Sequence, residues 1–507
     1  MLFNSYIFIF LFLPICIIGY FLINKTGKYR LGHAFLLGMS LWFYGYFNPA
    51  YLLIIIASVC INYTFYYVMK RMQKATMLEA VTENYELQNM ASSSIGRLKK
   101  CKPVMIIAVV ANLGIIFYFK YMDFFIENVN TILKTDWPLM HIVLPLGISF
   151  FTFQQISFVV DTYRGEVPTY DFLTYACYVT FFPQLVAGPI VTHDEMIPQL
   201  MNPAKKRVDW NNMAMGFYMF AMGLAKKILI ADVFGNAVNW GYENVPELKA
   251  TNAIFIAVAY YFQIYFDFSG YCDMAIGLGK MLNIELPVNF DSPYKSLSIA
   301  EFWKRWHKTL TRFFTRYVYI PLGGNRKGKV LTLVNIFIVF LLSGLWHGAA
   351  WTFVLWGVMN GIFVIINRIF KKQFDAMHPA LGWIITQVFT CLAWVFFRAN
   401  TIGDAVQVIK QILYVDFTNI DVNILYAFQT SPLKYLLDGT PVTHSLPFIY
   451  VGIYYFLALI VVLGCRNSHE RMIAFKPNVK TMLWTAVLLV ASVLSFSGIS
   501  TFLYFNF

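Results

Sequence analysis

The sequence predicts an all-α polytopic membrane protein. Of its 507 residues, 59% are hydrophobic and only 13% are charged, about half the charged fraction of a soluble protein. Many apolar runs approach the roughly 20 residues that a helix needs to cross the hydrocarbon core of a bilayer. The net charge of +13 comes from basic residues in the short connections between these runs, as the positive-inside bias predicts. Membrane lipids are therefore the expected surroundings, and the basic character does not indicate a nucleic-acid partner.

The first apolar runs set the expected orientation of the chain. Residues 6–23 lack a basic flank and a small-residue cleavage site, so we expect a retained helix there and not a signal peptide. Basic residues follow the first run at 25–30 and the third run at 70–74. Both clusters face the cytoplasm if the N-terminus is extracytoplasmic. Residues 76–102 are then a polar cytoplasmic loop, helical or not, and residues 104–119 cross back.

Two apolar runs in the middle of the chain are interrupted by proline and glycine, at 141–160 and at 172–191. If both crossed the membrane, the basic cluster at 205–207 would lie outside, against the positive-inside bias. One of the two is therefore expected to be a broken or re-entrant segment, which is tolerated only where protein buries its backbone. The sequence does not distinguish between them.

The next two apolar runs carry ionisable residues. Lys226-Lys227 lies inside the run 211–233, so these side chains either face protein or a watery cavity, or they snorkel to a helix end. The run 254–268 continues into Asp267-Phe-Ser269-Gly270-Tyr-Cys-Asp273, where two carboxylates and a hydroxyl surround a glycine break. This cluster either caps a helix and binds backbone or helps to line a site. Residues 289–293, beginning at Asn289, are expected to form a turn.

A basic and aromatic stretch at 301–320 is the centre of the prediction. On a helical wheel that starts at Phe302, one face between about 0° and 120° holds Phe302, Trp303, Trp306, Leu310, Phe313, Phe314, Tyr317 and Ile320. The opposite face, between about 200° and 320°, holds Lys304, Arg305, Lys308, Arg312 and Arg316. This pattern is typical of a helix that lies in a membrane interface. His307 falls on the seam between the faces, and Pro321 with Gly323-Gly324 ends the helix.

Two roles remain open for the cations of this stretch. They either face the anionic headgroups of the inner leaflet or hold the phosphates of a soluble acyl donor, to which arginine offers bidentate contacts. The candidate donor-binding residues are Lys304, Arg305, Arg312, Arg316 and Arg326.

His347 ends the apolar run that follows, in Trp346-His347-Gly348. A lone histidine on an apolar helix is usually a satisfied core residue, but an ionisable group at membrane depth is also a functional candidate, and imidazole suits general-base chemistry near neutral pH. Ser343, one turn earlier, is either a nucleophile or a small residue for helix packing. Without a protein nucleophile, direct attack by a hydroxyl on an activated acyl group, with His347 taking the proton, is the simplest chemistry.

The other histidines and the cysteines carry weaker signals. Six histidines lie at loops or span ends, where a solvated or capping role is expected: His33, His141, His193, His378, His444 and His469. Five of the seven cysteines lie in apolar stretches and are expected to be small buried hydrophobes: Cys16, Cys60, Cys177, Cys272 and Cys391. No cysteine pair has zinc-ligand spacing, so we expect no metal site.

The remaining spans complete one domain over residues 1–507. Their expected order is an outward span at 330–346, an inward span at 351–370, an outward span at 381–397, an outer amphipathic helix at 402–414, an external acidic loop at 416–444, an inward span at 449–463 and an outward span at 482–496. The total is about eleven crossings of the roughly 30 Å core. Both termini are then extracytoplasmic, in the cytoplasmic (inner) membrane of the cell.

Three motifs carry a resemblance to a known family. Phe302-Trp-Lys-Arg-Trp-His307, Tyr319-Ile-Pro-Leu-Gly-Gly-Asn-Arg-Lys-Gly328 and Ser343-Gly-Leu-Trp-His-Gly348 resemble the signature of the membrane-bound O-acyltransferase family. The Pro-Leu-Gly-Gly-Asn-Arg run is similar to the branch that contains membrane subunits for alginate O-acetylation. Further matches to that branch are the motifs at 155–165, 182–189 and 266–273 and the final residues 502–507.

The resemblance implies about eleven spanning helices, with interfacial or re-entrant helices, around a tunnel between a cytoplasmic donor side and an outer acceptor side. It places the family's catalytic histidine at His347 and its second polar position at His307. The expected supporting residues are Trp346, Ser343, Asp267, Ser269, Asp273 and Asn289.

The resemblance also implies a reaction and partners. This branch passes an acetyl group, with acetyl-CoA as the expected donor and no bound cofactor, to a separate extracytoplasmic SGNH-type transferase. That partner modifies a polysaccharide and works beside the polysaccharide synthesis machinery. The alternative function is a transporter or flippase in which His347, Lys226 and Asp267 line a permeation path. Sparse intramembrane charge and the lack of repeated halves with paired broken helices favour the transferase.

Overall fold

The computed structural model describes residues 1–82, 88–414, 416–429, 448–496 and 502–503, the side chains of residues 76–99 excepted. Helices and their connections make up all of this described part, and it contains no strand. The all-α prediction is therefore confirmed. The chain divides into two compact units, which are described separately, and the prediction of one domain over residues 1–507 stays a prediction.

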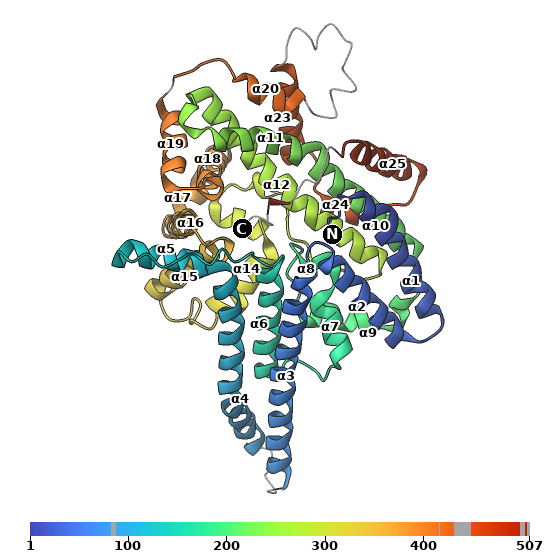
Figure 1. Ribbon diagram of the computed structural model, residues 1–507. Coiled ribbons are helices and arrows are strands. Elements are labelled where there is room, and N and C mark those ends of the chain that lie inside the picture. The colour runs from blue at the N-terminus through green and yellow to red at the C-terminus, as the bar shows by residue number, and fades with distance from the viewer. Residues whose placement is uncertain (83–87, 415, 430–447, 497–501, 504–507) are drawn as a thin grey trace. The chain divides into compact units, whose positions relative to one another are not determined.

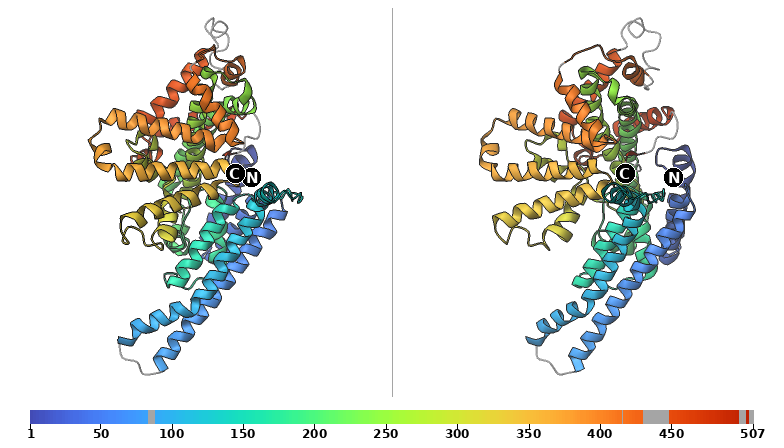
Figure 2. Two further views of the ribbon diagram at one scale, coloured as in Figure 1. Left: turned by 90° about the vertical axis from the view of Figure 1, so that its left-hand side faces the viewer. Right: turned by 60° about the vertical axis from the view of Figure 1, so that its left-hand side comes forward.

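The first unit comprises residue 1, residues 10–209 and residues 282–286. Its helices are α1 (Leu13–Lys25), α2 (Tyr29–Gly45), α3 (Ala50–Thr82), α4 (Gln88–Ile116), α5 (Met122–Leu133), α6 (Ile148–Arg164), α7 (Phe172–Thr180), α8 (Phe182–Leu185) and α9 (His193–Met201). The π-helical segment η2 (Phe117–Tyr121) joins α4 to α5. The long helices α3 and α4 lie side by side (Figures 1 and 2). The predicted loop at 76–102 is thus largely helical.

The second unit comprises residues 2–9, 210–281 and 287–507. Its helices are α10 (Trp210–Ala225), α11 (Asp232–Glu243), α12 (Ala250–Met281), α13 (Ile299–Arg305), α14 (Lys308–Phe314), α15 (Lys329–His347), α16 (Trp351–Ile369), α17 (Lys371–Ala376), α18 (Pro379–Arg398), α19 (Ile402–Tyr414), α20 (Val422–Gln429), α23 (Phe448–Leu463), α24 (Ser468–Ile473) and α25 (Val479–Leu494). Two π-helical segments, η4 (Lys226–Ala231) and η7 (Thr315–Tyr319), continue α10 and α14.

Within the described part, seven helices are long and apolar enough to cross a membrane. They are Phe8–Lys25, Ala50–Ala75, Lys100–Leu133, Ala250–Met281, Lys329–His347, Trp351–Ile369 and Pro379–Arg398. Two shorter apolar helices, Phe448–Leu463 and Val479–Leu494, accompany them. The polytopic character is therefore confirmed. The total of about eleven crossings, the tunnel and the sides of the termini stay predictions.

The broken segment of the middle region is residues 172–191. This run forms only α7, with nine residues, and α8, with four. At 1.5 Å per residue α7 is about 14 Å long, half the thickness of the hydrocarbon core. Residues 174–193 are buried throughout. Protein therefore surrounds the irregular backbone, which is the condition under which such a segment is tolerated.

The glycine break predicted at Gly270 is wrong, because α12 is continuous from Ala250 to Met281. A Cβ added at Gly270 would lie 2.8 Å from the carbonyl oxygen of Gly223, and one at Gly223 would lie 2.5 Å from that of Gly270. The missing side chains therefore let α10 and α12 approach closely, as small residues do where helices cross in membranes.

Two histidines of the first unit are buried, against the prediction of a solvated or capping role. The His33 ring lies 2.9 Å from the carbonyl oxygen of Leu200 and 3.0 Å from Lys206 Nζ. His193 lies 3.6 Å from the buried carboxylate of Asp161. The partners come from distant parts of the sequence, so local position did not reveal the burial.

The other minor predictions have mixed outcomes. His378 caps α18 by accepting a hydrogen bond from the backbone N–H of Ala380, as predicted. His444 lies outside the described residues. Cys16, Cys177 and Cys272 are buried, but Cys60 is exposed on α3 and Cys391 is half-buried.

Candidate active site

The predicted continuous helix over residues 302–320 is wrong, because the chain breaks at Trp306-His307. Trp306 is extended, and His307 has a left-handed backbone with φ of 45°. Asn289 causes this break. Its carbonyl oxygen accepts from the N–H of Lys308 at 3.0 Å, and its Oδ1 accepts from the N–H of Thr309 at 3.2 Å and from the Thr309 hydroxyl at 3.0 Å. The first N–H groups of α14 therefore bond to Asn289 and not to α13.

The aromatic side chains of this stretch pack into protein. Phe302 and Trp306 are 0% and 1% exposed, and their rings stack with centroids 5.5 Å apart. Trp306 also contacts Tyr294, at 6.2 Å, and Trp394, at 5.0 Å. Phe302, Trp303 and Trp306, from the face that resembles a membrane anchor on the helical wheel, are thus part of the core of the second unit, whereas Ile320 at the end of that face is 60% exposed.

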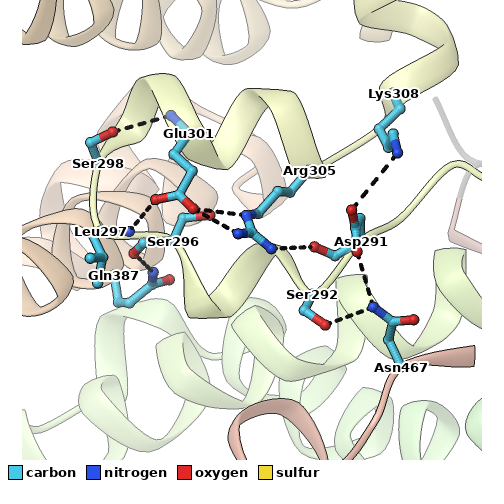
Figure 3. Close-up of polar contacts among 10 residues, drawn as sticks. All are labelled: Asp291, Ser292, Ser296, Leu297, Ser298, Glu301, Arg305, Lys308, Gln387 and Asn467. Carbon is cyan, nitrogen blue, oxygen red and sulfur yellow. Dashed lines mark hydrogen bonds and ion pairs between the residues drawn. The ribbon is translucent and has the colours of Figure 1, made fainter. Parts of the chain in front are cut away.

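Two of the cations are held by carboxylates of the same region (Figure 3). Arg305 donates to Glu301 at 2.8–2.9 Å and to the carbonyl oxygen of Asp291 at 3.2 Å. Lys308 lies 3.9 Å from the Asp291 carboxylate. Of the other candidate donor-binding residues, Lys304, Arg312 and Arg326 are exposed and Arg316 is half-buried. Arg305 thus has a local structural role, and the exposed cations face outward from the fold.

His307 is completely buried and is held in one tautomer. Its Nδ1 lies 3.1 Å from Oδ1 of Asn289, an oxygen that already accepts from two groups of Thr309. Nδ1 is therefore the donor, which leaves the lone pair on Nε2. Burial lowers the pKa of His307 from 6.5 to about 3, because desolvation disfavours the charged imidazolium. His307 is therefore a neutral imidazole at physiological pH.

His347 is the last residue of α15 and is only 4% exposed. Its ring lies 6.5 Å from that of His307, measured between centroids. Three aromatic rings surround it, those of Trp346 at 4.8 Å, Trp356 at 5.1 Å and Phe397 at 5.1 Å. The fold thus brings together two histidines that lie 40 positions apart in the sequence, in an environment built from aromatic rings.

The close packing of α15 on α16 positions His347. A Cβ added at Gly344 would lie 2.4 Å from the carbonyl oxygen of Phe353, and one at Gly357 would lie 2.6 Å from that of Phe340. Ser343 is buried next to this contact. This position is consistent with the packing alternative for Ser343.

The acidic cluster of α12 forms ion pairs with the two lysines of η4. Lys226 donates to Asp273 at 2.7 Å and lies 3.4 Å from the Ser269 hydroxyl. Lys227 lies 2.6 Å from Asp267 and 2.8 Å from Asp232. The lysines therefore face protein and do not snorkel. Because these opposite charges neutralise each other, the arrangement does not support a permeation path.

The structure thus joins four of the predicted site residues, His307, His347, Trp346 and Asn289, and places Asp267, Ser269 and Asp273 in the ion-pair network. It also adds contacts that the sequence did not indicate. Phe268 lies 4.8 Å from the His307 ring, and Cys272 accepts from Asn289 Nδ2 at 3.4 Å. These two residues are one helical turn apart on α12. The sequence did not indicate Trp356 and Phe397 as site residues, because nothing in it distinguishes them from the other aromatic residues of the membrane spans.

This geometry suits the transfer of a proton from a hydroxyl to an imidazole. A neutral imidazole can accept a proton from a hydroxyl, and rings that exclude water strengthen each electrostatic interaction within the site. The neutral His307 ring, 6.5 Å from the His347 ring, adds no positive charge beside it.

Comparisons with known proteins agree with this description. Residues 146–403 match the family model of the membrane-bound O-acyltransferases. The chain is 36% identical to a peptidoglycan O-acetyltransferase of Helicobacter pylori, over 100% of this chain and 98% of that protein. It is 36% identical to the probable alginate O-acetylase AlgI of Pseudomonas aeruginosa, over 79% and 73%. A teichoic acid D-alanyltransferase of Bacillus subtilis is 24% identical, over 52% and 71%.

The residues matched by the family model, 146–403, include both histidines and every residue described above as contacting them. The relative from Helicobacter pylori aligns with the whole chain. The chain therefore belongs to the membrane-bound O-acyltransferase family, and it is a membrane-bound acyltransferase.

Proposed function

We propose that the protein transfers an acetyl group from a cytoplasmic donor, acetyl-CoA, across the membrane for O-acetylation of an extracytoplasmic polysaccharide. The observation that carries this proposal is the burial of His347 beside His307, at the end of a membrane-spanning helix. The names of the relatives, a peptidoglycan O-acetyltransferase and alginate O-acetylases, support acetyl transfer to a polysaccharide.

In the proposed reaction His347 is the general base. The oxygen of the acceptor hydroxyl attacks the carbonyl carbon of the thioester, and His347 takes the hydroxyl proton. The carbon–sulfur bond then breaks, and the coenzyme A thiolate leaves and recovers the proton. His307 is a positioning residue, whose fixed tautomer and neutral charge keep the ring environment of His347 constant.

The orientation of α15 supports transfer across the membrane. The basic turn that precedes Lys329 is expected inside, and His347 lies 18 residues further along the helix. At 1.5 Å per residue this distance is about 27 Å, close to the full depth of the core. His347 is therefore expected near the extracytoplasmic end of α15.

The exposed cations Arg312 and Arg326, which follow His307 in the sequence, are expected to bind the phosphates of the donor. Replacing Arg312 and Arg326 by glutamate should weaken acetyl-CoA binding at least tenfold and increase the salt sensitivity of what remains, because charge-assisted phosphate contacts are lost. Isothermal titration with acetyl-CoA on the purified protein measures this change. Arg305 is left intact, since its partner is Glu301.

The matched control is Arg466→Glu, which reverses another exposed arginine near the predicted inner surface. It should leave acetyl-CoA binding unchanged. If the Arg312→Glu/Arg326→Glu variant binds the donor normally but inserts poorly into membranes, these cations are headgroup anchors and the donor role is excluded.

The acceptor is proposed to be an extracytoplasmic partner protein, an SGNH-type transferase, which hands acetyl to the polymer. The His347 ring is enclosed by aromatic rings, a site better suited to a narrow protein segment than to a polysaccharide chain. Of the external connection predicted at 415–445, the structure describes residues 416–429, which include α20. The purified protein with acetyl-CoA and de-acetylated polymer should therefore give no polymer acetylation until the partner is added.

This expectation is checked by reconstitution in proteoliposomes with radiolabelled acetyl-CoA. Efficient labelling of the polymer without a second protein would refute the hand-off. Release of coenzyme A after the partner is added to the same preparation shows that the preparation is active.

A further inference from the structure

A cavity of about 400 Å³ lies beside the ring environment of His347, where α16 begins and α18 ends. Its walls include Asn239, Thr352, Phe353, Phe397, Arg398 and Asn400. Asn400 is exposed, so the cavity reaches the surface.

One layer of aromatic rings separates the cavity from His347. Phe397 lines the cavity and has its ring centroid 5.1 Å from that of His347. Phe353 lines it as well and packs against Phe397 at 4.9 Å. His347, Trp351 and Arg398 are terminal residues of α15, α16 and α18, and by the positive-inside bias all three ends are extracytoplasmic. The cavity is therefore on the expected acceptor side of the site.

Arg398 gives the cavity a positive charge. Its Nη2 donates to Asn239 Oδ1 at 3.1 Å, and its guanidinium carbon lies 4.9 Å from the centre of the Tyr242 ring. Among the residues that the structure describes, no carboxylate forms an ion pair with Arg398. The remaining N–H groups of a guanidinium fork fit a carboxylate well.

Two further donors line the same cavity. Thr352 is 2% exposed, and its hydroxyl has no hydrogen-bond partner in the described part of the chain. Thr352 is also in the first turn of α16, a helix of 19 residues whose N-cap residue, Ala350, makes no side-chain cap. The first N–H groups of a helix and its dipole favour an anion at this end. The Arg398 guanidinium, the Thr352 hydroxyl and the start of α16 therefore all favour an anionic ligand.

We propose that this cavity binds an acidic peptide segment of the acceptor protein, with a carboxylate held by Arg398, Thr352 and the start of α16. The neighbouring hydroxyl of the segment then reaches His347 once the rings of Phe353 and Phe397, which pack against each other at 4.9 Å, move apart. This inference rests on the proposed function. It adds a recognition rule, namely that the acceptor carries an aspartate or glutamate next to its acetylated residue.

The test is peptide binding without any acyl donor. The full-length protein in lipid nanodiscs is titrated with Gly-Asp-Ser-Gly and Gly-Asn-Ser-Gly, both labelled with fluorescein at the N-terminus and amidated at the C-terminus, and anisotropy reports binding. The aspartate peptide should bind at least tenfold more tightly, because a hydrogen-bonded ion pair is lost in the asparagine peptide. Arg398→Gln and, separately, Thr352→Val should reduce this preference, while Arg398→Lys should retain part of it.

The control is Arg368→Gln, which removes an exposed cation at the opposite end of α16 and should leave the preference intact. Equal binding of both peptides by the native protein, or an unchanged preference in Arg398→Gln, would overturn the proposal. So would stronger competition by an oligogalacturonate than by unlabelled aspartate peptide, since the polymer itself would then be the occupant. If Arg398→Gln does not fold, Thr352→Val decides. Because no donor is present, the result is independent of whether acetyl transfer occurs.

Discussion

His347→Gln is expected to lower polysaccharide O-acetylation by about 10²–10⁴-fold, the range that a positioned proton acceptor contributes to a rate. Glutamine fills much of the space inside the rings of Trp346, Trp356 and Phe397, so the aromatic packing is retained better than with alanine, which would leave a cavity. The measurement is the initial rate of polymer acetylation by the protein reconstituted together with its extracytoplasmic partner, normalised to folded protein by size-exclusion chromatography.

The control variant is His141→Asn, which removes an exposed histidine and introduces a residue that tolerates the positive φ of 49° at that position. It should retain the native rate. A near-native rate in His347→Gln would exclude His347 as the base. A loss of acetyl-CoA binding in the same variant would instead assign the residue to donor binding.

The position of His347 could be predicted from the sequence because a physical rule with a long range sets it. The basic turn at 325–329 and the apolar run at 330–345 define one membrane crossing. Once the basic turn fixes its inner end, the length of the apolar run fixes its outer end. The structure gives α15 nearly these limits. The two histidine motifs could be recognised in the sequence because each is a contiguous stretch.

The break at His307 could not be predicted, because the wheel pattern continues through it. Each residue from Phe302 to Tyr319 is compatible with a helix, so local propensity predicts one. The break depends on Asn289, whose carbonyl and side chain take the first N–H groups of α14. Such a tertiary contact overrides propensity, and one sequence without its partner segment does not reveal it.

The arrangement of the acidic cluster around Gly270 could not be predicted either, because it also depends on a tertiary contact. In isolation, two carboxylates beside a glycine resemble a helix end. In the structure, Gly270 meets the backbone of Gly223, and the carboxylates pair with Lys226 and Lys227. The lysines and the aspartates were each visible in the sequence as costly charges in apolar runs. Their pairing follows from the close approach of α10 to α12.

This pairing predicts a large effect on stability. Lys227→Met should lower the free energy of unfolding by about 3–5 kcal/mol, because it leaves the buried Asp267 carboxylate without its counter-charge. Lys227 and Asp267 have 2% exposed side chains, whereas Asp232, the second partner of Lys227, is 24% exposed. Asp232 can therefore be solvated in the variant, but Asp267 cannot.

The double variant Lys227→Met/Asp267→Asn separates the pair from the rest of the network. Asparagine keeps the oxygen that accepts from the backbone N–H of Leu503, so it removes the uncompensated charge and should recover most of the stability lost by Lys227→Met. The reference is Lys249→Met, which breaks a 3.5 Å ion pair between Lys249 and Asp416. Both of these side chains are 56% exposed, so the loss should cost only about 0–1 kcal/mol.

Unfolding is followed by tryptophan fluorescence in a series of denaturant concentrations in detergent micelles. If Lys227→Met and Lys249→Met lose equal stability, the network is solvated and its lysines are not part of the core that supports His307 through α12. If the double variant is as unstable as Lys227→Met, the cost comes from lost packing of the lysine stem, and the ion pair itself contributes little.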